Sequence, residues 1–148
     1  MHTAYHHVVN VEVAIVRDGR YLAIERGARM AYGAGWLTFP GGKLDVGPGL
    51  AGALEETARR EAREEVGLEL DDPIVYVESH TFATPDTPVL DVVMLARASS
   101  GEAYPASPDE VDAVHWLTVE AFLADPRTQP WTKTSLALAE ARRQDLGW

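Results

Sequence analysis

Three glutamates, Glu61, Glu64 and Glu65, stand at i, i+3 and i+4 in a stretch with helix-forming composition. A helix turns by about 100° per residue, so the three side chains fall within about 100° of arc and within one turn of rise. Clustered carboxylates repel one another, and a divalent cation removes that cost. Hard oxygen ligands suit Mg²⁺ or Mn²⁺, which also accept phosphate oxygens. The spacing indicates a metal site for phosphate chemistry; a solvated acidic face with neighbouring arginines is the alternative.

The helix that carries these acids is expected over residues 54–66. Its apolar row is spaced four residues apart and borders the acids: Leu54, Ala58, Ala62 and Val66. Gly67 follows, where a helix end favours a left-handed residue. Arg60 is the one cation that flanks the acids, beside Glu64, whereas Arg59 and Arg63 point away. The acids are therefore expected at the rim of a cleft.

The rest of the chain reads as strands followed by two short or medium helices. Strands are expected at 8–16, 20–25, 36–39, 74–83, 89–97 and 113–117, and helices at 118–122 and about 130–144. Asp18-Gly19 suits a tight hairpin turn between the first two strands, and Pro40-Gly41-Gly42 ends the third. No repeat or linker interrupts the pattern, so we expect one α+β domain over residues 1–148.

Charge and composition exclude several classes of protein. The 148 residues include 13 Lys and Arg against 23 Asp and Glu, a net charge of −10, which argues against binding a nucleic-acid backbone. No apolar stretch is long enough for a membrane helix, and no secretion signal is apparent. The chain has no cysteine, which excludes thiolate metal sites and suits a cytoplasmic location. His2, His6 and His7 are interpreted as a solvated end rather than as metal ligands.

The segment from Arg60 to Leu68 reads REAREEVGL and matches the REUxEExGU core of the Nudix box, where U is an aliphatic residue. Pro40-Gly41-Gly42-Lys43 matches the Gly-Gly-Lys that opens the box after a strand. The chain therefore resembles a MutT-like Nudix hydrolase over roughly residues 8–142, including the 110–116 segment before the last helices. The resemblance implies an α/β/α sandwich with a mixed central β-sheet and a strand-loop-helix-loop catalytic motif.

The sequence departs from the family pattern at one point. The pattern places another Glu between the Gly-Gly-Lys and the Arg, and the two positions that correspond to it hold Pro48 and Gly52. The segment between Gly42 and Arg60 is also four residues longer than the pattern. We expect an extended loop before the helix, which affects substrate reach and leaves the helical acids in place.

The resemblance implies the roles of the site residues. Glu61 and Glu65 are expected to bind Mg²⁺ or Mn²⁺, assisted by the backbone carbonyl of Gly41 or Gly42. Glu64 is expected to be a shared ligand or the base that orients water, and Arg60 to hold an acid in place. The general base varies within the family between a box Glu and an acid in a late loop. Glu110 is the candidate of the second kind, with a solvated loop acid as the alternative.

Other side chains are candidates for substrate contacts. Cations at the mouth of an acidic cleft help to retain an anion, which makes Lys43, Arg26 and Arg29 candidates for phosphate contacts. Trp36 is the candidate for stacking on a base, together with Tyr32 or Phe39. Because Trp36 and Phe39 fall on opposite faces of a short strand, at least one of them is expected in the core.

The implied activity is metal-dependent hydrolysis of a nucleoside triphosphate or another nucleoside diphosphate linked to a group X, with water attacking phosphorus. The expected partner is a small-molecule nucleotide, and the chain is expected to be a monomer or homodimer. An ADP-ribose or nucleotide-sugar pyrophosphatase is an alternative, since Pro85 lies near a position where such members carry a proline. A noncatalytic nucleotide-binding module and a structural domain with an incidental acidic helix are the others.

Overall fold

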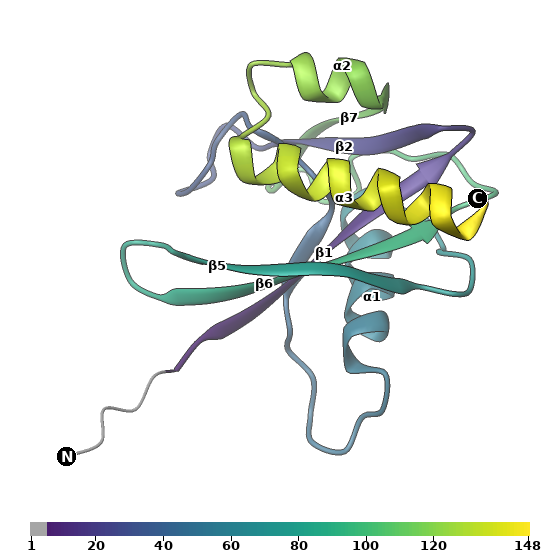
Figure 1. Cartoon of the computed structure of the whole chain (residues 1–148). Coiled ribbons are helices and arrows are strands. Elements are labelled where there is room, and N and C mark those ends of the chain that lie inside the picture. The colour runs from purple at the N-terminus through teal and green to yellow at the C-terminus, as the bar shows by residue number, and fades with distance from the viewer. Residues whose placement is uncertain (1–5) are drawn as a thin grey trace.

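The computed structural model describes residues 6–148 and contains seven strands and three helices within that range (Figure 1). The strands are β1 (Val8–Arg17), β2 (Arg20–Arg26), β3 (Leu37–Thr38), β4 (Gly41–Lys43), β5 (Val75–Ala83), β6 (Pro88–Arg97) and β7 (Val111–Thr118). The helices are α1 (Ala53–Val66), α2 (Val119–Ala124) and α3 (Pro130–Leu146). His2 lies outside the described residues, and His7 is exposed.

The strands form one mixed sheet in the order β3-β2-β1-β6-β5, to which β4 adds beside β1 and β7 beside β2. The pairing of β1 with β6 is parallel, and the others are antiparallel. The hairpin predicted at Asp18-Gly19 joins β1 to β2, and both turn residues have positive φ, as a type I′ turn requires. The expected α+β class with a mixed central sheet is confirmed.

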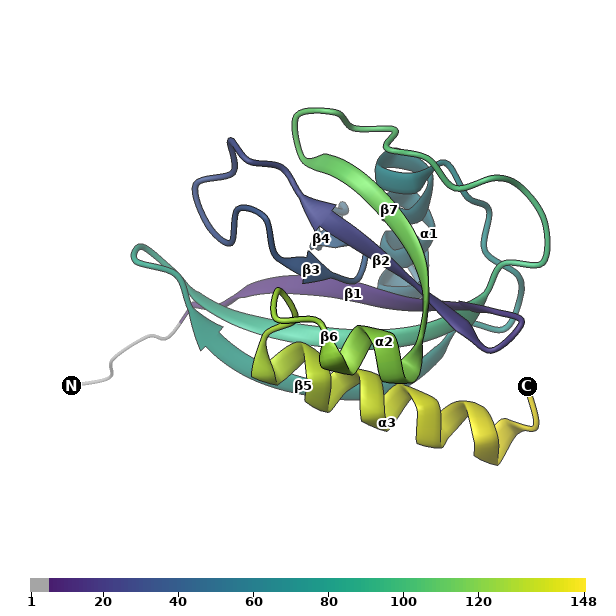
Figure 2. The same ribbon diagram turned by 90° about the horizontal axis from the view of Figure 1, so that it is seen from above.

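Helices cover both faces of this sheet (Figure 2). On one face α1 packs against the odd-numbered residues of β1, and both sets are fully buried: Ala58, Ala62, Val66, Val11, Val13 and Ile15. On the other face α2 and α3 pack against Ala14 and Val16 through Phe122, Leu136 and Ala139. Because strand side chains alternate between faces, β1 contributes to two separate cores. The apolar row predicted for the first helix is the surface that attaches α1 to the sheet.

The strand β4 was not predicted, because Gly41 and Gly42 follow a proline and indicate the end of a strand. In the structure this segment pairs antiparallel with β1, with Gly42 opposite Val11 and Gly41 opposite Glu12. A Cβ atom at Gly41 would stand 2.9 Å from the Cα of Glu12. Gly41 therefore allows a close approach of the β4 and β1 backbones, and the segment continues the sheet rather than ending the strand pattern.

The ends of the helices follow local signals in the sequence. Gly67 ends α1 with φ 70°, and the Thr118 side chain accepts a hydrogen bond from the backbone of Ala121 at the start of α2. The start of α1 has no side-chain cap, since Gly52 occupies that position in the left-handed region. Residues 44–52 form the extended loop before α1, which projects from the body of the molecule (Figure 1).

Candidate active site

The acids of α1 differ in their exposure. The residues Glu61 and Glu65 are 8% and 5% exposed, whereas the side chain of Glu64 is 58% exposed. The burial of two acids follows from helix geometry, because they lie one turn apart beside the apolar row that packs on the sheet. The expected cleft rim is therefore occupied by Glu61 and Glu65, with Glu64 at its solvent side.

The strand β4 holds the two buried carboxylates. The backbone N–H of Gly41 donates to Oε1 of Glu65 at 2.7 Å. A Cβ atom at Gly42 would overlap the carboxylate of Glu61, so this carboxylate can occupy its position only because residue 42 is glycine. Lys43 completes β4, and its backbone carbonyl accepts from Arg60 at 2.8 Å.

The two glycine carbonyls have different surroundings. Leu44 donates its backbone N–H to Val9, and Val13 donates to Pro40, which fixes the phase of the β1–β4 ladder. In an antiparallel pair the hydrogen-bonded residues alternate, so the carbonyl of Gly42 points to Val11 in β1. The carbonyl of Gly41 stays outside the ladder, on the edge where its N–H meets Glu65.

Arg60 contacts Glu61 more closely than Glu64, beside which it was expected. Its Nη2 atom is 3.0 Å from Oε1 of Glu61, while its Nε atom is 3.9 Å from Glu64. Its guanidinium also donates to the backbone carbonyls of Lys43 and Asp45. The guanidinium extends along the helix surface to these carbonyls, which draws it toward Glu61. Arg60 thus joins α1 to the start of the extended loop, and Arg59 and Arg63 pair elsewhere, as expected, with Asp72 and Glu69.

Glu110 lies in a loop that is anchored on the carboxyl end of α1. Ser107 donates its hydroxyl to the backbone carbonyl of Glu64 at 2.6 Å, and Ala106 donates to that of Glu65 at 3.0 Å. The charge of Glu110 is close enough to raise the pKa of both Glu61 and Glu65. The fold therefore brings a late-loop acid to the helical acids across more than forty positions of the sequence.

Burial makes the charged form of these acids costly. Desolvation is the largest cause that raises the pKa of Glu65 from its ordinary value of 4.5 to about 8, followed by the opposing hydrogen bond from Gly41. Burial also raises the pKa of Glu61, against the lowering effect of Arg60. A cation at this position would offset both costs, and the oxygen donors suit Mg²⁺ or Mn²⁺. In residues 6–148, however, no three acids or histidines are gathered closely enough to form a ready metal cage.

The raised pKa of Glu65 predicts how the stability of the metal-free protein depends on pH. A folded-state pKa of about 8 against 4.5 means that the folded chain binds this proton more tightly. The contribution is full below pH 4.5 and is lost as the pH rises toward 8. In EDTA, we expect the melting temperature to fall between pH 6 and 8.5 more steeply for wild type than for Glu65→Gln. Parallel melting curves for the two proteins would contradict this assignment.

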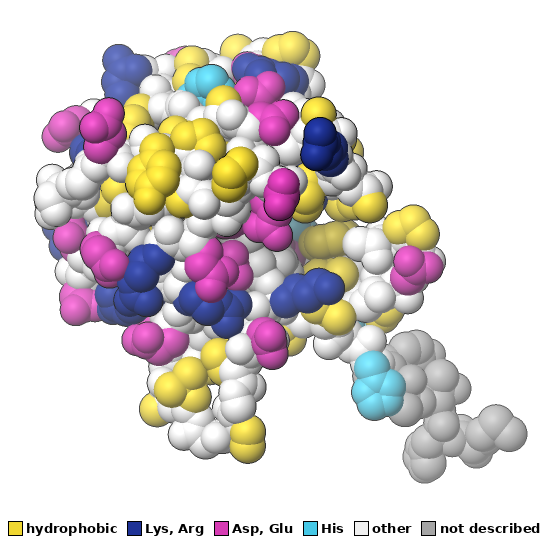
Figure 3. All heavy atoms as spheres, turned by 180° about the vertical axis from the view of Figure 1, so that it is seen from behind, with side chains coloured by type: hydrophobic (Ala, Val, Ile, Leu, Met, Phe, Trp, Pro, Cys, Tyr) yellow, Lys and Arg dark blue, Asp and Glu magenta, His cyan; other side chains and the backbone are white. Residues whose placement is uncertain are grey.

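A cavity of about 380 Å³ opens beside β4 on the α3 face of the sheet. Five aromatic residues line it: Tyr32, Trp36, Phe39, Phe82 and Trp131. The rings of Trp36 and Trp131 lie 5.5 Å apart and those of Tyr32 and Trp36 5.2 Å apart, both edge to face. Figure 3 shows a hollow beside the projecting β5–β6 hairpin in which hydrophobic side chains are visible. Such a cavity fits a flat ring system.

The predicted substrate contacts divide into two groups. Arg26, Lys43 and Trp36 line the cavity, and Arg26 donates to the backbone carbonyl of Tyr32 at 2.7 Å. Arg29 is exposed and is not among the residues that line the cavity. Phe39 is 2% exposed and packs on Phe122, so it belongs to the core, as expected for one of the two aromatic residues.

Two polar residues of β1 that line the cavity were not among the predicted site residues. Asn10 and Glu12 of β1 line the cavity, and Glu12 hydrogen-bonds with the buried Asp91 of β6. Burial and the neighbouring carboxyl of Asp91 raise the pKa of Glu12 well above its ordinary value. The signal was present as two polar residues at alternate positions of an apolar strand. Alternation alone indicates a solvent face, and only the tertiary structure covers that face with α3.

The NUDIX domain pattern matches residues 6–138, which is most of the chain. The chain belongs to the NUDIX family. This agrees with the strand-loop-helix motif from Gly41 to Val66 and confirms the resemblance on which the site was predicted. Members of this family are typically pyrophosphohydrolases that use a divalent metal.

Solved structures support this membership. A MutT NUDIX hydrolase from Burkholderia pseudomallei is 31% identical, with a TM-score of 0.74 over 90% of this chain and 98% of its own. The E. coli ORF135 protein is 26% identical, with a TM-score of 0.69 over 95% of this chain and 94% of its own. A MutT protein from Methanosarcina mazei Go1, at 18% identity and a TM-score of 0.77 over 97% and 99% of the chains, shares the fold. No curated protein sequence matches this NUDIX chain.

None of the helices in residues 6–148 combines the length and apolar character that crossing a bilayer demands.

Proposed function

We propose that this NUDIX protein hydrolyses the pyrophosphate of a nucleoside triphosphate, or of another nucleoside diphosphate linked to a group X, by attack of water on phosphorus. One observation carries the proposal: two buried carboxylates, Glu61 and Glu65, lie against the β4 glycines, and β4 also borders the aromatic cavity. A nucleotide with its base in the cavity would extend its phosphates along β4 toward these acids.

Glu61 and Glu65 are the proposed Mg²⁺ or Mn²⁺ ligands, with Glu64 as a shared ligand. Of the two glycines, Gly41 is the better candidate for a backbone carbonyl ligand of the metal, because the carbonyl of Gly42 points into the β1–β4 ladder. The bound cation supplies charge stabilisation to the phosphoryl oxygens. Arg60 is a positioning residue, since it holds the carboxylate of Glu61 at 3.0 Å.

Glu64 and Glu110 are the two candidates for the base that orients the attacking water. Both line a second hollow of about 370 Å³ outside the helical acids, together with Ser107 and Asp109. The exposed side chain of Glu64 can turn toward water or metal, whereas the position of Glu110 depends on its loop. The base should set the acidic limb of the rate profile, so replacing each by Gln identifies it.

Lys43 and Arg26 supply positive charge where the phosphates are expected. The chain has a net charge of −10, so an anionic substrate meets repulsion that cations near the cavity reduce. Both side chains line the cavity, and Lys43 continues the β4 strand that holds the acids. Arg29 in the exposed 27–35 loop is the weaker candidate for the same role.

Trp36 is the proposed stacking residue, and its replacement tests the cavity. Trp36→Ala should raise KM by about tenfold with little change in kcat, because stacking on a base is worth about 1–3 kcal/mol. Trp116→Ala is the matched control, since Trp116 lies on β7 against Arg17, away from the cavity lining. Steady-state kinetics on one substrate compares the two variants. An equal change in both would assign the effect to stability instead.

The proposed function is tested by assaying the purified chain with Mg²⁺ on a panel of nucleoside triphosphates, ADP-ribose and nucleotide sugars. The expected result is release of a nucleoside monophosphate with pyrophosphate or the second phosphorylated product. Activity should vanish in EDTA and return with Mg²⁺ or Mn²⁺. Binding of nucleotides without turnover by any of them would instead identify a noncatalytic module.

A further inference from the structure

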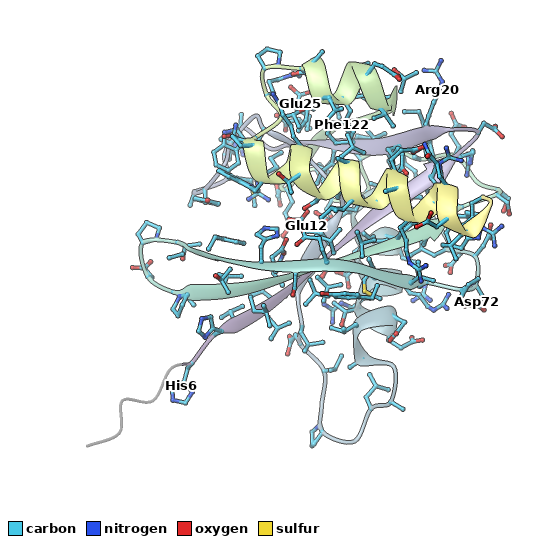
Figure 4. The ribbon with its side chains drawn as sticks, in the orientation of Figure 1. His6, Glu12, Arg20, Glu25, Asp72 and Phe122 are labelled. Atoms are coloured by element: carbon cyan, nitrogen blue, oxygen red, sulfur yellow. The ribbon has the colours of Figure 1, made fainter. Side chains whose placement is uncertain are left out.

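The floor of the aromatic cavity includes Asn10 and Glu12 of β1, which belong to a row of polar side chains on three neighbouring strands. Asn10 of β1 is opposite Asp91 of β6, which is opposite His80 of β5. Residues in register share a face, and Glu12 lies on the same face two positions after Asn10. Figure 4 shows Glu12 between α3 and the β5–β6 strands. An acidic group thus lies inside the molecule, on a face that its sequence pattern assigns to solvent.

Asp91 is fully buried and incompletely bonded. Its Oδ1 atom accepts from Nδ2 of Asn10 at 2.7 Å, and its side chain hydrogen-bonds with Glu12. Its Oδ2 atom and Nε2 of His80, 3.5 Å apart, have no hydrogen-bond partner. Neither Glu12 nor Asp91 forms an ion pair with Lys or Arg within residues 6–148. Such burial is unfavourable unless a partner supplies the missing hydrogen bonds.

The free atoms of Asn10 and Glu12 are mostly acceptors. One of the two amide N–H groups of Asn10 donates to Asp91, which leaves its oxygen and one N–H, and a Glu12 carboxyl bonded to Asp91 leaves its second oxygen. Arg26 is held by the backbone carbonyl of Tyr32 through both Nε and Nη2. A ring carbonyl placed on this floor would meet oxygen lone pairs, whereas an amino group would donate to them.

We propose that Glu12 is a specificity-determining residue that accepts a hydrogen bond from an exocyclic amino group of the nucleobase, so that amino bases are selected over their keto counterparts. This rests on the proposed function, which places the base in the aromatic cavity. Stacking on Trp36, whose ring meets Trp131 edge to face, would hold the plane of the base. Glu12 then distinguishes the ring edge, a difference that stacking alone does not detect.

The test measures binding of nucleoside monophosphates, the products of the proposed reaction, by calorimetry in EDTA. The pairs are AMP with IMP and CMP with UMP, which differ in an amino or keto group at one ring position and in an acceptor or N–H at the adjacent ring nitrogen. Wild type should bind the amino member of at least one pair about tenfold more tightly, the discrimination expected of a good base contact. Glu12→Gln, whose amide presents both a donor and an acceptor, should reduce this ratio to about threefold or less.

Glu78→Gln is the matched control. Glu78 lies on the same face and accepts from Ser135 at 2.7 Å, but it is absent from the cavity lining. This variant should keep the wild-type preference. Glu12→Asp, which keeps a carboxyl and shortens its reach, should weaken binding of the amino member by at least threefold and serves if Glu12→Gln does not fold.

Several outcomes would overturn the inference. They are equal binding within both pairs by wild type, no binding of any monophosphate, an equal loss for both members in Glu12→Gln, or loss of the preference in Glu78→Gln. The measurement involves no metal and no bond cleavage. Absence of hydrolysis would therefore overturn the proposed function alone, whereas intact hydrolysis without base preference would overturn this inference alone.

Discussion

Glu65→Gln is expected to lower kcat/KM for metal-dependent hydrolysis by about 1,000-fold. Glu65 is the more deeply buried of the two proposed metal ligands, and among residues 6–148 only the backbone N–H of Gly41 donates a hydrogen bond to its carboxylate. Loss of a carboxylate ligand weakens the binding of a cation that contributes several kcal/mol of transition-state stabilisation at the phosphoryl group. Each increment of about 1.36 kcal/mol in that stabilisation corresponds to a tenfold change in rate. Steady-state kinetics over a Mg²⁺ titration measures the effect.

The fold of this variant should remain intact, because Gln keeps an acceptor for the Gly41 N–H and removes a charge whose burial is costly. The melting temperature in EDTA at pH 8 should therefore equal or exceed that of wild type. Glu55→Gln is the matched control, since Glu55 lies in the first turn of the same helix, away from the buried acids. Activity of Glu65→Gln within threefold of wild type would show that Glu65 binds no catalytic metal.

Gly42→Ala is expected to lower activity by about 10–100-fold without unfolding the chain. The added methyl would overlap the carboxylate of Glu61, which sits at the far end of a flexible side chain and can swing away. The backbone of Gly42 is not in the left-handed region, so alanine introduces no strain there. Residues that orient a metal ligand typically affect metal affinity or activity by this amount. The expected signature is a higher Mg²⁺ concentration at half-maximal rate.

Gly47→Ala is the control for this substitution. A Cβ atom at Gly47 meets no atom within 4 Å, and the residue belongs to the same extended loop region between β4 and α1. Its activity and Mg²⁺ requirement should match those of wild type. If Gly42→Ala behaved like Gly47→Ala, the contact between β4 and Glu61 would have no role in the reaction.

The Glu61-Glu64-Glu65 helix could be predicted from the sequence because its information is local. Side chains three and four positions apart share a helix face whatever surrounds them, and an apolar row on the adjoining arc shows which way the helix packs. The same holds for the Asp18-Gly19 hairpin and for Gly67, where positive φ restricts the choice of residue. These signals were sufficient to predict the α+β class and the acids of the motif.

The pairing of β4 with β1 and the contact of Arg60 with Glu61 depend on segments that meet only after folding. A Gly-Gly pair predicts the end of a strand unless the partner strand with which it pairs is known. The acid that a long arginine side chain contacts depends on which backbone carbonyls also lie within its reach. Helix spacing predicted Arg60 beside Glu64, and that contact is present at 3.9 Å. The closer contact with Glu61, at 3.0 Å, and the bonds to the extended loop depend on folding.

The sequence by itself determined which residues carry oxygen ligands and on which face of one helix they lie. Only the tertiary structure decided that Glu110 approaches them and that Asn10 and Glu12 face a cavity instead of solvent. The physical reason is that a helical face is fixed by neighbours within one turn, whereas cover for a strand face comes from elsewhere. Here it comes from α3, more than a hundred residues after β1.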